Sequence, residues 1–527
     1  MQEAARMRLA GRTNSRLPGF SVARLSSRLP AALISAALAT CLLLPGCGGH
    51  SPRCENAAGT MADLTEIPQS LAAFAEIYGS PALGLAHSSG PLRGADTLLR
   101  SHSEARADMA RFRRHFFLPW DMACASQEAV QDVRDELGRT GERRGFAENF
   151  HPWSEDAWQE LADLADLPRL ERALRGAAPR SAVTVRSTDL RALPTLKPRF
   201  SAMHGAGQGW PFDLFQYSRL PVGVPLAVVH ESRDGAWLFV ECSGLWGWIR
   251  TEDAAFAGAD FRRLWRKARF AAFVRDGVSL RFRSLGVGQS KGAPAIAPGA
   301  FLAEAGIGTA LPALRSGEVL LPMRGLDGQA YAVTASYAIP GLPGRGVSGF
   351  DAVSGAAVLM PQALTPRSVA RIGDRMLGQS YGWGGLYGAR DCSAMMRDLF
   401  TAFGIWLPRN SGKQAEAGMR VSLEGLSARA KEKALIEKAH PFRTLVWMPG
   451  HIGLYVGQKD GAALFHNMWG LRTKNGGSEG RAVIGRAVVT SLKPGEERGD
   501  IDEKGLLIER VRAFTVIGGE FSEYSED

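Results

Sequence analysis

Cysteine is scarce, and the few cysteines lack the spacings of a disulfide framework or a structural metal site. Six cysteines occur among 527 residues, and no two of them form a C-x-x-C pair. Such wide spacing argues against a disulfide scaffold. The sequence also has no H-E-x-x-H motif and no Cys/His cluster with the spacing of zinc ligands. We therefore expect neither a metal nor another cofactor.

A concentrated basic surface is also missing, which excludes a second class of function. The formal net charge is +10, but residues 1–46 hold six arginines against one glutamate, so about half of the excess lies in that segment. No run of Lys and Arg is interleaved with aromatic residues in the way that nucleic-acid binding requires. Nucleic acid is therefore not an expected partner.

The N-terminus has the pattern of a secretion signal. Its arginines precede an apolar run from Pro30 to Leu44, which is shorter than the roughly 20 residues that span a bilayer. The run leads into Leu-Pro-Gly-Cys, ending at Cys47. This tetrapeptide resembles a bacterial lipobox, which implies that Cys47 is lipidated and begins the mature chain. We expect an exported, lipid-anchored protein that faces the periplasm, on the outer membrane rather than the inner one. The alternatives are a secreted protein with an ordinary cleaved signal and a protein that retains the segment as an anchor.

The chain is too long for one hydrophobic core, so we expect several domains. Leucines between Ala157 and Leu174 recur near the helical period, which predicts helices. From Ala182 onward apolar residues alternate in short runs broken by Asp-Gly and Pro turns, which predicts small β-barrels in an α+β chain. The expected segments are a signal peptide (1–46), a tether (47–66), a helical domain (67–178), a first barrel (179–255), a second barrel (256–355) and a catalytic domain (356–527).

The first predicted barrel has a distinctive sequence pattern. Residues 181–255 contain V-T-V-R-S-T-D-L-R, D-G-A-W-L-F-V-E and a closing G-W-I-R. This pattern resembles the bacterial SH3-like module that accompanies NlpC-type wall peptidases. A second, weaker copy runs from D-G-V-S-L-R-F to Y-A-V-T-A-S-Y within residues 256–355. The resemblance implies that the first barrel contributes to the substrate site, and the alternative is that both barrels are only spacers.

A cysteine between a Gly-rich loop and a predicted helix is the strongest catalytic signal. In Y-G-W-G-G-L-Y-G-A-R-D-C-S, Cys392 precedes apolar residues at helical spacing from Met396 to Phe403, and Gly404 is well placed to end the helix. The free N–H groups and the dipole at a helix N-terminus stabilise negative charge and so lower the pKa of a thiol. We expect Cys392 to be a nucleophile with a lowered pKa.

A general base for this thiol is present in the segment G-H-I-G-L-Y-V-G, which contains His451. If the following turn is centred on Lys459 and Asp460, the next strand returns antiparallel, and His466 lies diagonal to His451 on the same face. His466 can then orient the imidazole of His451, with Asn467 as a competing orienter. The pattern predicts a nucleophile, a base and an orienter in the order Cys, His, His.

Six motifs in sequence order give a resemblance to a family. They are Tyr381 with W-G-G, D-C-S at 391–393, L-P-R-N-S at 407–411, Gln414, G-H-I-G-L-Y-V-G at 450–457 and His466. Together they look like the NlpC family of cell-wall cysteine endopeptidases, which have a papain-like fold. The resemblance implies Cys392 as nucleophile, His451 as general base and His466 as orienter.

The same resemblance implies a substrate and a pocket. The substrate is the stem peptide of peptidoglycan, or a muropeptide, cut between γ-D-glutamate and the following diamino acid, with a preference for stems whose L-Ala amine is free. The residues expected to form the pocket are Tyr381, Trp383, Asp391, Ser393 and Ser411, with Asp213 and Tyr217 from the first barrel. The carboxylate of Asp213 or Asp391 is expected to pair with the free ammonium group. We expect a monomer that meets the membrane through its N-terminal lipid.

Two other classes of function remain open at this point. An amidase or acyltransferase on the same fold would keep Cys392 and His451 but close the groove differently. A non-catalytic wall-binding lipoprotein would use the barrels alone, and the presence of the cysteine with both histidines argues against it.

Overall fold

The computed structural model describes residues 61–79, 94–173, 176, 178–203, 205, 207–285, 295–314, 317–338, 355–475 and 478–518. The predicted signal peptide, Cys47 and most of the predicted tether lie outside these residues. Across the described ranges, no helix has both the length and the apolar character needed to cross a membrane. The same ranges contain no group of three or more His, Cys, Asp or Glu side chains arranged to hold a metal ion.

The C-terminal part of the chain forms one antiparallel sheet with helices on both faces. The strand order is β15-β20-β16-β17-β18-β19. The strands are β15 (Met419–Ser422), β16 (Thr444–Met448), β17 (His451–Gln458), β18 (Ala462–Asn475), β19 (Ser478–Thr490) and β20 (Ala513–Val516). The helices are α8 (Pro366–Gly373), α9 (Cys392–Thr401), α10 (Ser411–Ala415), α11 (Ala428–Lys438) and α12 (Leu507–Arg510), with the 3₁₀ segments η6 (Trp383–Gly388) and η7 (Glu503–Gly505).

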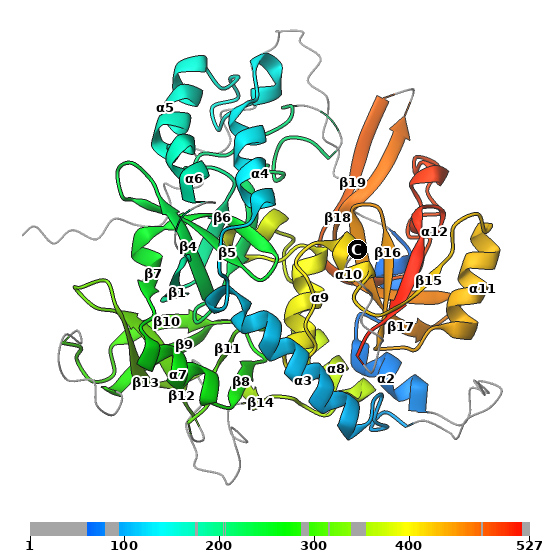
Figure 1. The fold of residues 1–527 in the computed structure, drawn as a ribbon. Helices are drawn as coiled ribbons and strands as arrows, with labels where there is room; N and C mark the ends of the chain where they lie inside the picture. The colour runs from blue at the N-terminus through cyan, green and yellow to red at the C-terminus, as the bar shows by residue number, and fades with distance from the viewer. Residues whose placement is uncertain are drawn as a thin grey trace, which may run out of the picture. The chain divides into compact units, whose positions relative to one another are not determined.

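The two faces of this sheet belong to different hydrophobic cores because successive side chains of a strand point in opposite directions. Leu454 and Phe465 lie in the core that also contains Leu399 and Phe400 of α9. Tyr455, like Leu464 and Val446, lies in the core that contains Leu435 of α11. Figure 1 shows α9 and α11 on opposite sides of the sheet. The sheet is thus sandwiched between helices.

The region of the first predicted barrel is a seven-stranded antiparallel sheet with the order β3-β2-β6-β5-β4-β1-β7. Its strands are β1 (Arg180–Thr184), β2 (Thr188–Arg191), β3 (Gln216–Leu220), β4 (Pro225–Glu231), β5 (Trp237–Cys242), β6 (Leu245–Arg250) and β7 (Ala254–Phe256), and the 3₁₀ segment η5 spans Thr251–Asp253. Its core holds alternating residues such as Leu226, Val228 and Val240, as expected for strands with one buried face.

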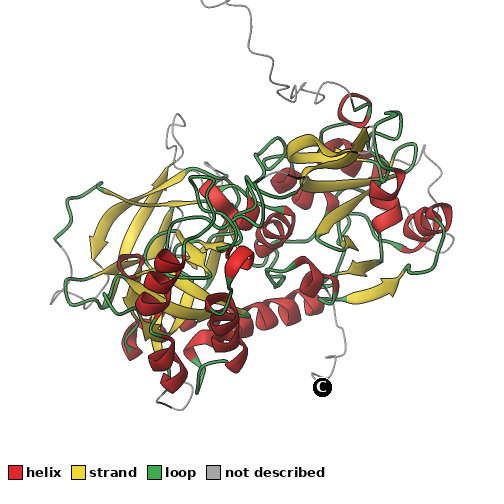
Figure 2. Ribbon diagram, turned by 90° about the horizontal axis from the view of Figure 1, so that it is seen from above, coloured by secondary structure: helices red, strands yellow, loops and turns green. Residues whose placement is uncertain are grey.

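The region of the second predicted barrel contains two smaller antiparallel sheets, with the orders β10-β9-β13-β12 and β11-β8-β14. The elements are α7 (Ala259–Lys267), β8 (Phe270–Phe273), β9 (Val278–Leu285), β10 (Phe301–Ala305), β11 (Ala310–Pro312), β12 (Glu318–Arg324) and β13 (Ala330–Ala338). Strand β14 (Ala357–Leu359) pairs with β8 although it lies past the predicted boundary at residue 355. In Figure 2 the strands of the two β regions lie together, apart from those of the C-terminal sheet, with helices between the two groups.

The N-terminal helices do not form a core of their own. They are α1 (Asp63–Glu66), α2 (Leu71–Gly79), α3 (His102–Phe117), α4 (Gln127–Leu137), α5 (Glu155–Ala165) and α6 (Leu167–Ala173), with the 3₁₀ segments η3 (Leu118–Trp120) and η4 (Gly141–Arg144). Leu71 of α2 and Phe112 of α3 lie in the core of α9. Val130 of α4 and Trp158 of α5 pack instead with Phe239 of the first barrel. The helices therefore connect the β domains with the C-terminal domain.

Candidate active site

Cys392 is the first residue of α9, and Asp391 caps the helix. The carboxylate of Asp391 accepts a hydrogen bond from the backbone N–H of Ala394 at 2.9 Å, as carboxylates commonly do at an N-cap. The thiol is buried. Burial, followed by the charge of Asp391, raises the pKa of Cys392 to about 12. The expected lowering of this pKa was wrong, because desolvation and the adjacent carboxylate outweigh the helix N-terminus.

The thiol lies beside the backbone of His451. Ile452 follows His451 in the chain, and its backbone N–H donates a hydrogen bond to the sulfur of Cys392. This hydrogen bond acts to lower the pKa of the thiol. Helix α9 also contacts both β17 and β18. The fold therefore brings the start of α9 to the start of β17, although about 60 residues separate Cys392 from His451 in the sequence.

The two histidines and a threonine form a row across three neighbouring strands. The distance from Nε2 of His451 to Nδ1 of His466 is 2.8 Å. On the other side of His466, its Nε2 lies 3.0 Å from the hydroxyl oxygen of Thr490 on β19. A Cβ atom on Gly453 would meet Cβ of His466 at 3.0 Å, so the glycine leaves room for the contact. The arrangement has the order of base and orienter that the sequence predicts.

The turn before His466 differs from the expected one by a residue. Gln458 pairs with Ala462, so the loop is centred on Asp460, which has a positive φ of 54°. An irregularity between Tyr455 and Gly457 absorbs the extra residue. Such β-bulges restore a register that a longer loop would shift. Leu454 consequently pairs with Phe465, and the predicted diagonal placement of the histidines is confirmed.

Burial makes both imidazoles neutral at neutral pH. Desolvation lowers the pKa of His466 to about 3. It also lowers the pKa of His451 well below its usual range, with smaller contributions from His466 and from Arg510 of α12. Burial therefore favours the neutral form of each group, the thiol of Cys392 and the imidazole of His451.

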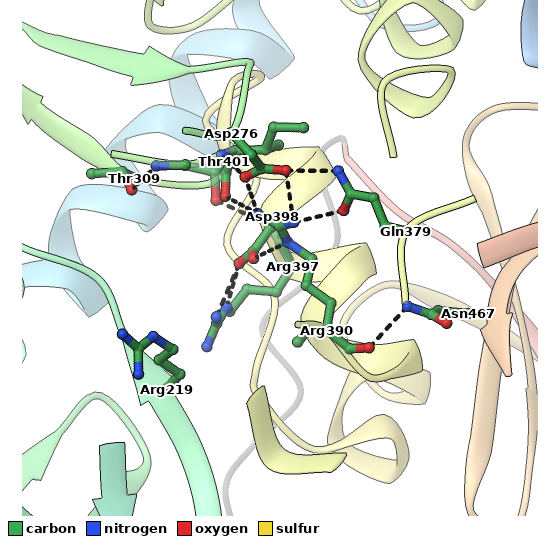
Figure 3. Close-up of polar contacts among 12 residues, drawn as sticks. Arg219, Asp276, Thr309, Gln379, Arg390, Arg397, Asp398, Thr401 and Asn467 are labelled. Atoms are coloured by element: carbon green, nitrogen blue, oxygen red, sulfur yellow. Dashed lines mark hydrogen bonds and ion pairs between the residues drawn. The ribbon is translucent and has the colours of Figure 1, made fainter. Parts of the chain in front are cut away.

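Asn467 is not the orienter of His451. Its side-chain N–H donates to the backbone carbonyl of Arg390 at 2.8 Å, because residues 466 and 467 point to opposite faces of β18. Figure 3 shows this contact and the polar cluster around Arg390. Arg390 forms a bidentate ion pair with Asp276 of the second β region and also bonds Asp398 of α9 at 2.8 Å. The second β region thus holds the segment that precedes Cys392.

Asp391 is already paired and is not a free carboxylate. Both terminal nitrogens of Arg409 contact its two oxygens, at 3.0 and 2.5 Å, and the N–H of Gly384 donates to it at 3.0 Å. Burial would raise the pKa of Asp391, but the charge and hydrogen bonds of Arg409 more than offset it, so this pKa is lowered. The expectation that Asp391 pairs with a substrate ammonium is therefore wrong, since its oxygens are already occupied by these donors.

Arg409 connects the nucleophile segment with the first barrel. Besides Asp391, it donates to the hydroxyl of Ser393 at 2.8 Å and to the hydroxyl of Ser218 on β3 at 2.9 Å. The side chain of Gln216, also on β3, donates to the carbonyl of Gly384 in the Gly-rich loop. The first barrel thus contacts both the loop before Cys392 and the ion pair beside it.

Of the remaining predicted pocket residues of the catalytic domain, Tyr381 lies beside the thiol, whereas Trp383 and Ser411 lie on elements that neighbour the first barrel and α9. Tyr381 lies close enough to Cys392 and Asp391 that their charges add to burial in raising its phenol pKa above the ordinary value. The ring of Trp383 meets the ring of Phe212 from the first barrel edge-on at 5.2 Å. Ser411 is the half-buried first residue of α10, which contacts α9.

Asp213 and Tyr217 do not serve as the predicted barrel ligands. The carboxylate of Asp213 is buried, pairs with Arg191 at 2.7 Å and accepts two backbone N–H groups. Tyr217 packs in the core shared by α4 and the barrel, and burial followed by Glu136 and Asp132 raises its pKa. The prediction for Tyr217 was wrong because side chains alternate along a strand. Its neighbours on β3, Gln216 and Ser218, are the residues that face the catalytic domain.

Sequence reasoning missed Arg409 and Thr490 as site residues. Arg409 lies inside the L-P-R-N-S motif, where a single arginine follows two apolar residues. That position was the only signal in the sequence that could have indicated a role for Arg409 at the site. Thr490 has no local signal, because it meets His466 only through the pairing of β18 with β19, in which Leu464 lies opposite Thr490.

Known proteins resemble three segments of this chain. Residues 378–470 match the NlpC/P60 family, residues 198–250 match an SH3 domain of the SH3b1 type, and residues 36–169 match the N-terminal NLPC_P60 stabilising domain. Residues 378–470 thus form an NlpC/P60-type domain, which follows the segments that match the SH3 domain and the N-terminal stabilising domain. The expected α+β fold, with an NlpC-type domain, an SH3-like domain and a helical N-terminal region, is confirmed.

Two individual proteins are similar to it. The gamma-D-glutamyl-L-lysine dipeptidyl-peptidase of Bacillus subtilis (strain 168) is 32% identical over 120 residues, which make up 22% of this chain and 36% of that protein. The chain thus spans about a third of the length of this curated relative. The solved structure of an NlpC/P60 endopeptidase from Photobacterium damselae subsp. piscicida has a TM-score of 0.67 at 22% identity, covering 86% of this chain and 98% of that one. The second likeness shows the fold.

Proposed function

We propose that this protein is a cysteine peptidase that hydrolyses the peptide stem of peptidoglycan. The observation that carries the proposal is the row of His451, His466 and Thr490 beside the buried thiol of Cys392. A thiol and an imidazole suffice for acyl transfer without a cofactor.

The resting protonation states define the chemical steps. His451 takes the thiol proton as the sulfur of Cys392 forms its bond to the carbonyl carbon of the substrate. The resulting imidazolium is stabilised by the lone pair on His466 and gives its proton to the departing amine as the C–N bond breaks. A water molecule, deprotonated by His451, then releases the acyl group and restores the thiol.

Charge on the substrate oxygen requires donors close to the sulfur. The backbone N–H groups of Cys392 and Ser393, at the start of α9, lie at the nucleophile and suit this role. Tyr381 keeps its proton, because its pKa is raised, and so it can donate a hydrogen bond from its hydroxyl group. These groups are available without a metal ion.

The first barrel supplies one wall of the substrate groove in this proposal. Phe212 contacts both Trp383 and Trp469 of the catalytic domain, at 5.2 and 6.0 Å between ring centroids. The ring of Trp469 lies 5.9 Å from that of Tyr381. A continuous set of aromatic contacts therefore runs from the barrel to a residue beside the thiol.

The bond cleaved is proposed to be the one between γ-D-glutamate and the following diamino acid, in stems with a free N-terminal L-Ala. The relative from Bacillus subtilis carries gamma-D-glutamyl-L-lysine dipeptidyl-peptidase in its name, which supports the choice of bond. Because Asp213 and Asp391 are both paired, the ammonium group needs other acceptors. The preference therefore rests on closure of the groove by the barrel.

The experiment incubates the full mature chain with defined muropeptides and reads the products by mass spectrometry. We expect cleavage of L-Ala-γ-D-Glu-diaminopimelate, weaker cleavage of its N-acetylated form, and loss of turnover in Cys392→Ser. The exposed cysteine provides the matched control, Cys124→Ser, which should retain activity. Substituting Phe212→Ala should reduce the discrimination between the free and acetylated peptides. Products released from a sugar–peptide amide bond would instead indicate an amidase.

Export and lipid anchoring are proposed from the leader alone. If Cys47 is acylated, Cys47→Ala should move the mature protein from membranes to the soluble periplasmic fraction, or block its processing. Unchanged fractionation and unchanged mass would refute the anchor.

A further inference from the structure

Thr490 is a buried threonine whose hydroxyl has a fixed direction. It lies 2.7 Å from the backbone carbonyl of Ser491 and 3.0 Å from Nε2 of His466. A carbonyl can only accept a hydrogen bond, and a hydroxyl has one proton to give. The proton of Thr490 therefore goes to Ser491, and its oxygen accepts from His466.

This direction determines where both imidazoles carry their protons. His466 must hold its proton at Nε2, because that nitrogen donates to Thr490. A neutral imidazole has one N–H, so Nδ1 of His466 is an acceptor. The nitrogen 2.8 Å from it, Nε2 of His451, must then donate. The remaining nitrogen of His451, Nδ1, is left with a lone pair.

We propose that Thr490 is a positioning residue that fixes the tautomers of His466 and His451, so that Nδ1 of His451 is free to take the proton of Cys392. The inference rests on the proposed peptidase function and adds a fourth residue to it. Thr490 touches neither the thiol nor a substrate in this role. It acts through two successive hydrogen bonds along the row of strands β17, β18 and β19.

Loss of the hydroxyl should favour the opposite arrangement. In Thr490→Val, the Nε2–H of His466 is buried without an acceptor, and an unsatisfied buried donor is costly. His466 relieves this by moving its proton to Nδ1, which then points an N–H at His451. His451 must accept at Nε2 and carry its proton at Nδ1, where it can no longer receive one from the thiol.

The first measurement reads the tautomers directly. In the full chain with ¹⁵N-labelled histidine, we expect His451 and His466 to show protonated Nε2 and unprotonated Nδ1. In Thr490→Val the His466 signals should change to protonated Nδ1, and in Thr490→Ser they should stay as in the natural chain. The charge of Arg510 also lowers the pKa of His451, and this residue is unchanged in all variants. Identical tautomers in Thr490→Val and the natural chain would overturn the proposal.

The second measurement is turnover of the stem peptide. The kcat/KM of Thr490→Val should fall about ten- to a hundredfold through kcat, which corresponds to the cost of one unsatisfied buried donor. Thr490→Ser keeps the hydroxyl and should recover most of the activity. Thr515→Val is the matched control, because Thr515 is equally buried on the same sheet and donates to the carbonyl of Ala415. A comparable loss in the control, or no rescue by serine, would show a structural effect and overturn the inference.

The two measurements separate this inference from the proposed function. If the natural chain has the expected tautomers and Thr490→Val changes them, while no muropeptide is cleaved, the positioning inference stands and the substrate assignment fails. If muropeptides are cleaved but His466 carries its proton at Nδ1, the substrate assignment stands and the positioning inference fails.

Discussion

Removing Arg409 should destabilise the protein more than removing both members of its ion pair. The side chains of Arg409 and Asp391 are only 8% and 10% exposed. Arg409→Met leaves the buried carboxylate of Asp391 with backbone and hydroxyl donors but no cation. Loss of one partner of a buried pair costs about 3–5 kcal/mol, whereas replacement of both partners by groups of similar shape is often close to neutral.

The pair of substitutions gives a direct test of this asymmetry. Asp391→Asn keeps the cap of α9, since Asn is as good an N-cap as Asp, but leaves Arg409 without its anion. We expect each single variant to lose about 3–5 kcal/mol of unfolding free energy, and the double variant to recover most of that loss. Urea unfolding of the full chain, followed by tryptophan fluorescence and circular dichroism, measures all three. A double variant that loses the sum of the single losses would refute the reasoning.

The pH dependence adds a second signature. In the natural chain the pKa of Asp391 is below its ordinary value, so its stabilising contribution is present above about pH 4 and is lost as pH falls through the lowered pKa. In Arg409→Met burial remains without the cation, so the carboxyl pKa should rise above its unfolded value. The deficit of this variant should then shrink as pH falls from 7 toward 5. A deficit that does not change with pH would show that the carboxylate is stabilised without Arg409.

Two further predictions concern the thiol and the second β region. Burial raises the pKa of Cys392 and lowers that of His451. Alkylation of Cys392 by iodoacetamide should therefore keep accelerating from pH 7 to beyond about pH 9. A rate that reaches a plateau below pH 7 would indicate a preformed thiolate–imidazolium pair. Asp276→Asn should cost about 1–2 kcal/mol of unfolding free energy, between the values for exposed and buried pairs, since Asp276 is 36% exposed and Arg390 12%. Asp327→Asn, on an exposed turn of the same region, should leave stability unchanged, and an equal loss there would contradict the role of Arg390.

Local patterns in the sequence were enough to locate the chemistry. The apolar spacing after Cys392 predicted α9, and the capping residue Asp391 is next to it in the chain. The two histidines could be placed on one strand face from a hairpin alone, because alternation along a strand and a short turn are local properties. The fold class followed from the change of hydrophobic period along the chain.

Contacts between distant segments were decided only by tertiary structure. The ion-pair partner of Asp391 is Arg409. The orientation of Tyr217 depends on how β3 lies between two domains. Thr490 meets His466 through the pairing of two strands, outside either catalytic motif. Whether a helix N-terminus lowers a thiol pKa also depends on how deeply neighbouring domains bury it. Sequence periodicity shows which residues share a face of one element, but the element that packs against that face, and the water that it excludes, are set by the whole chain.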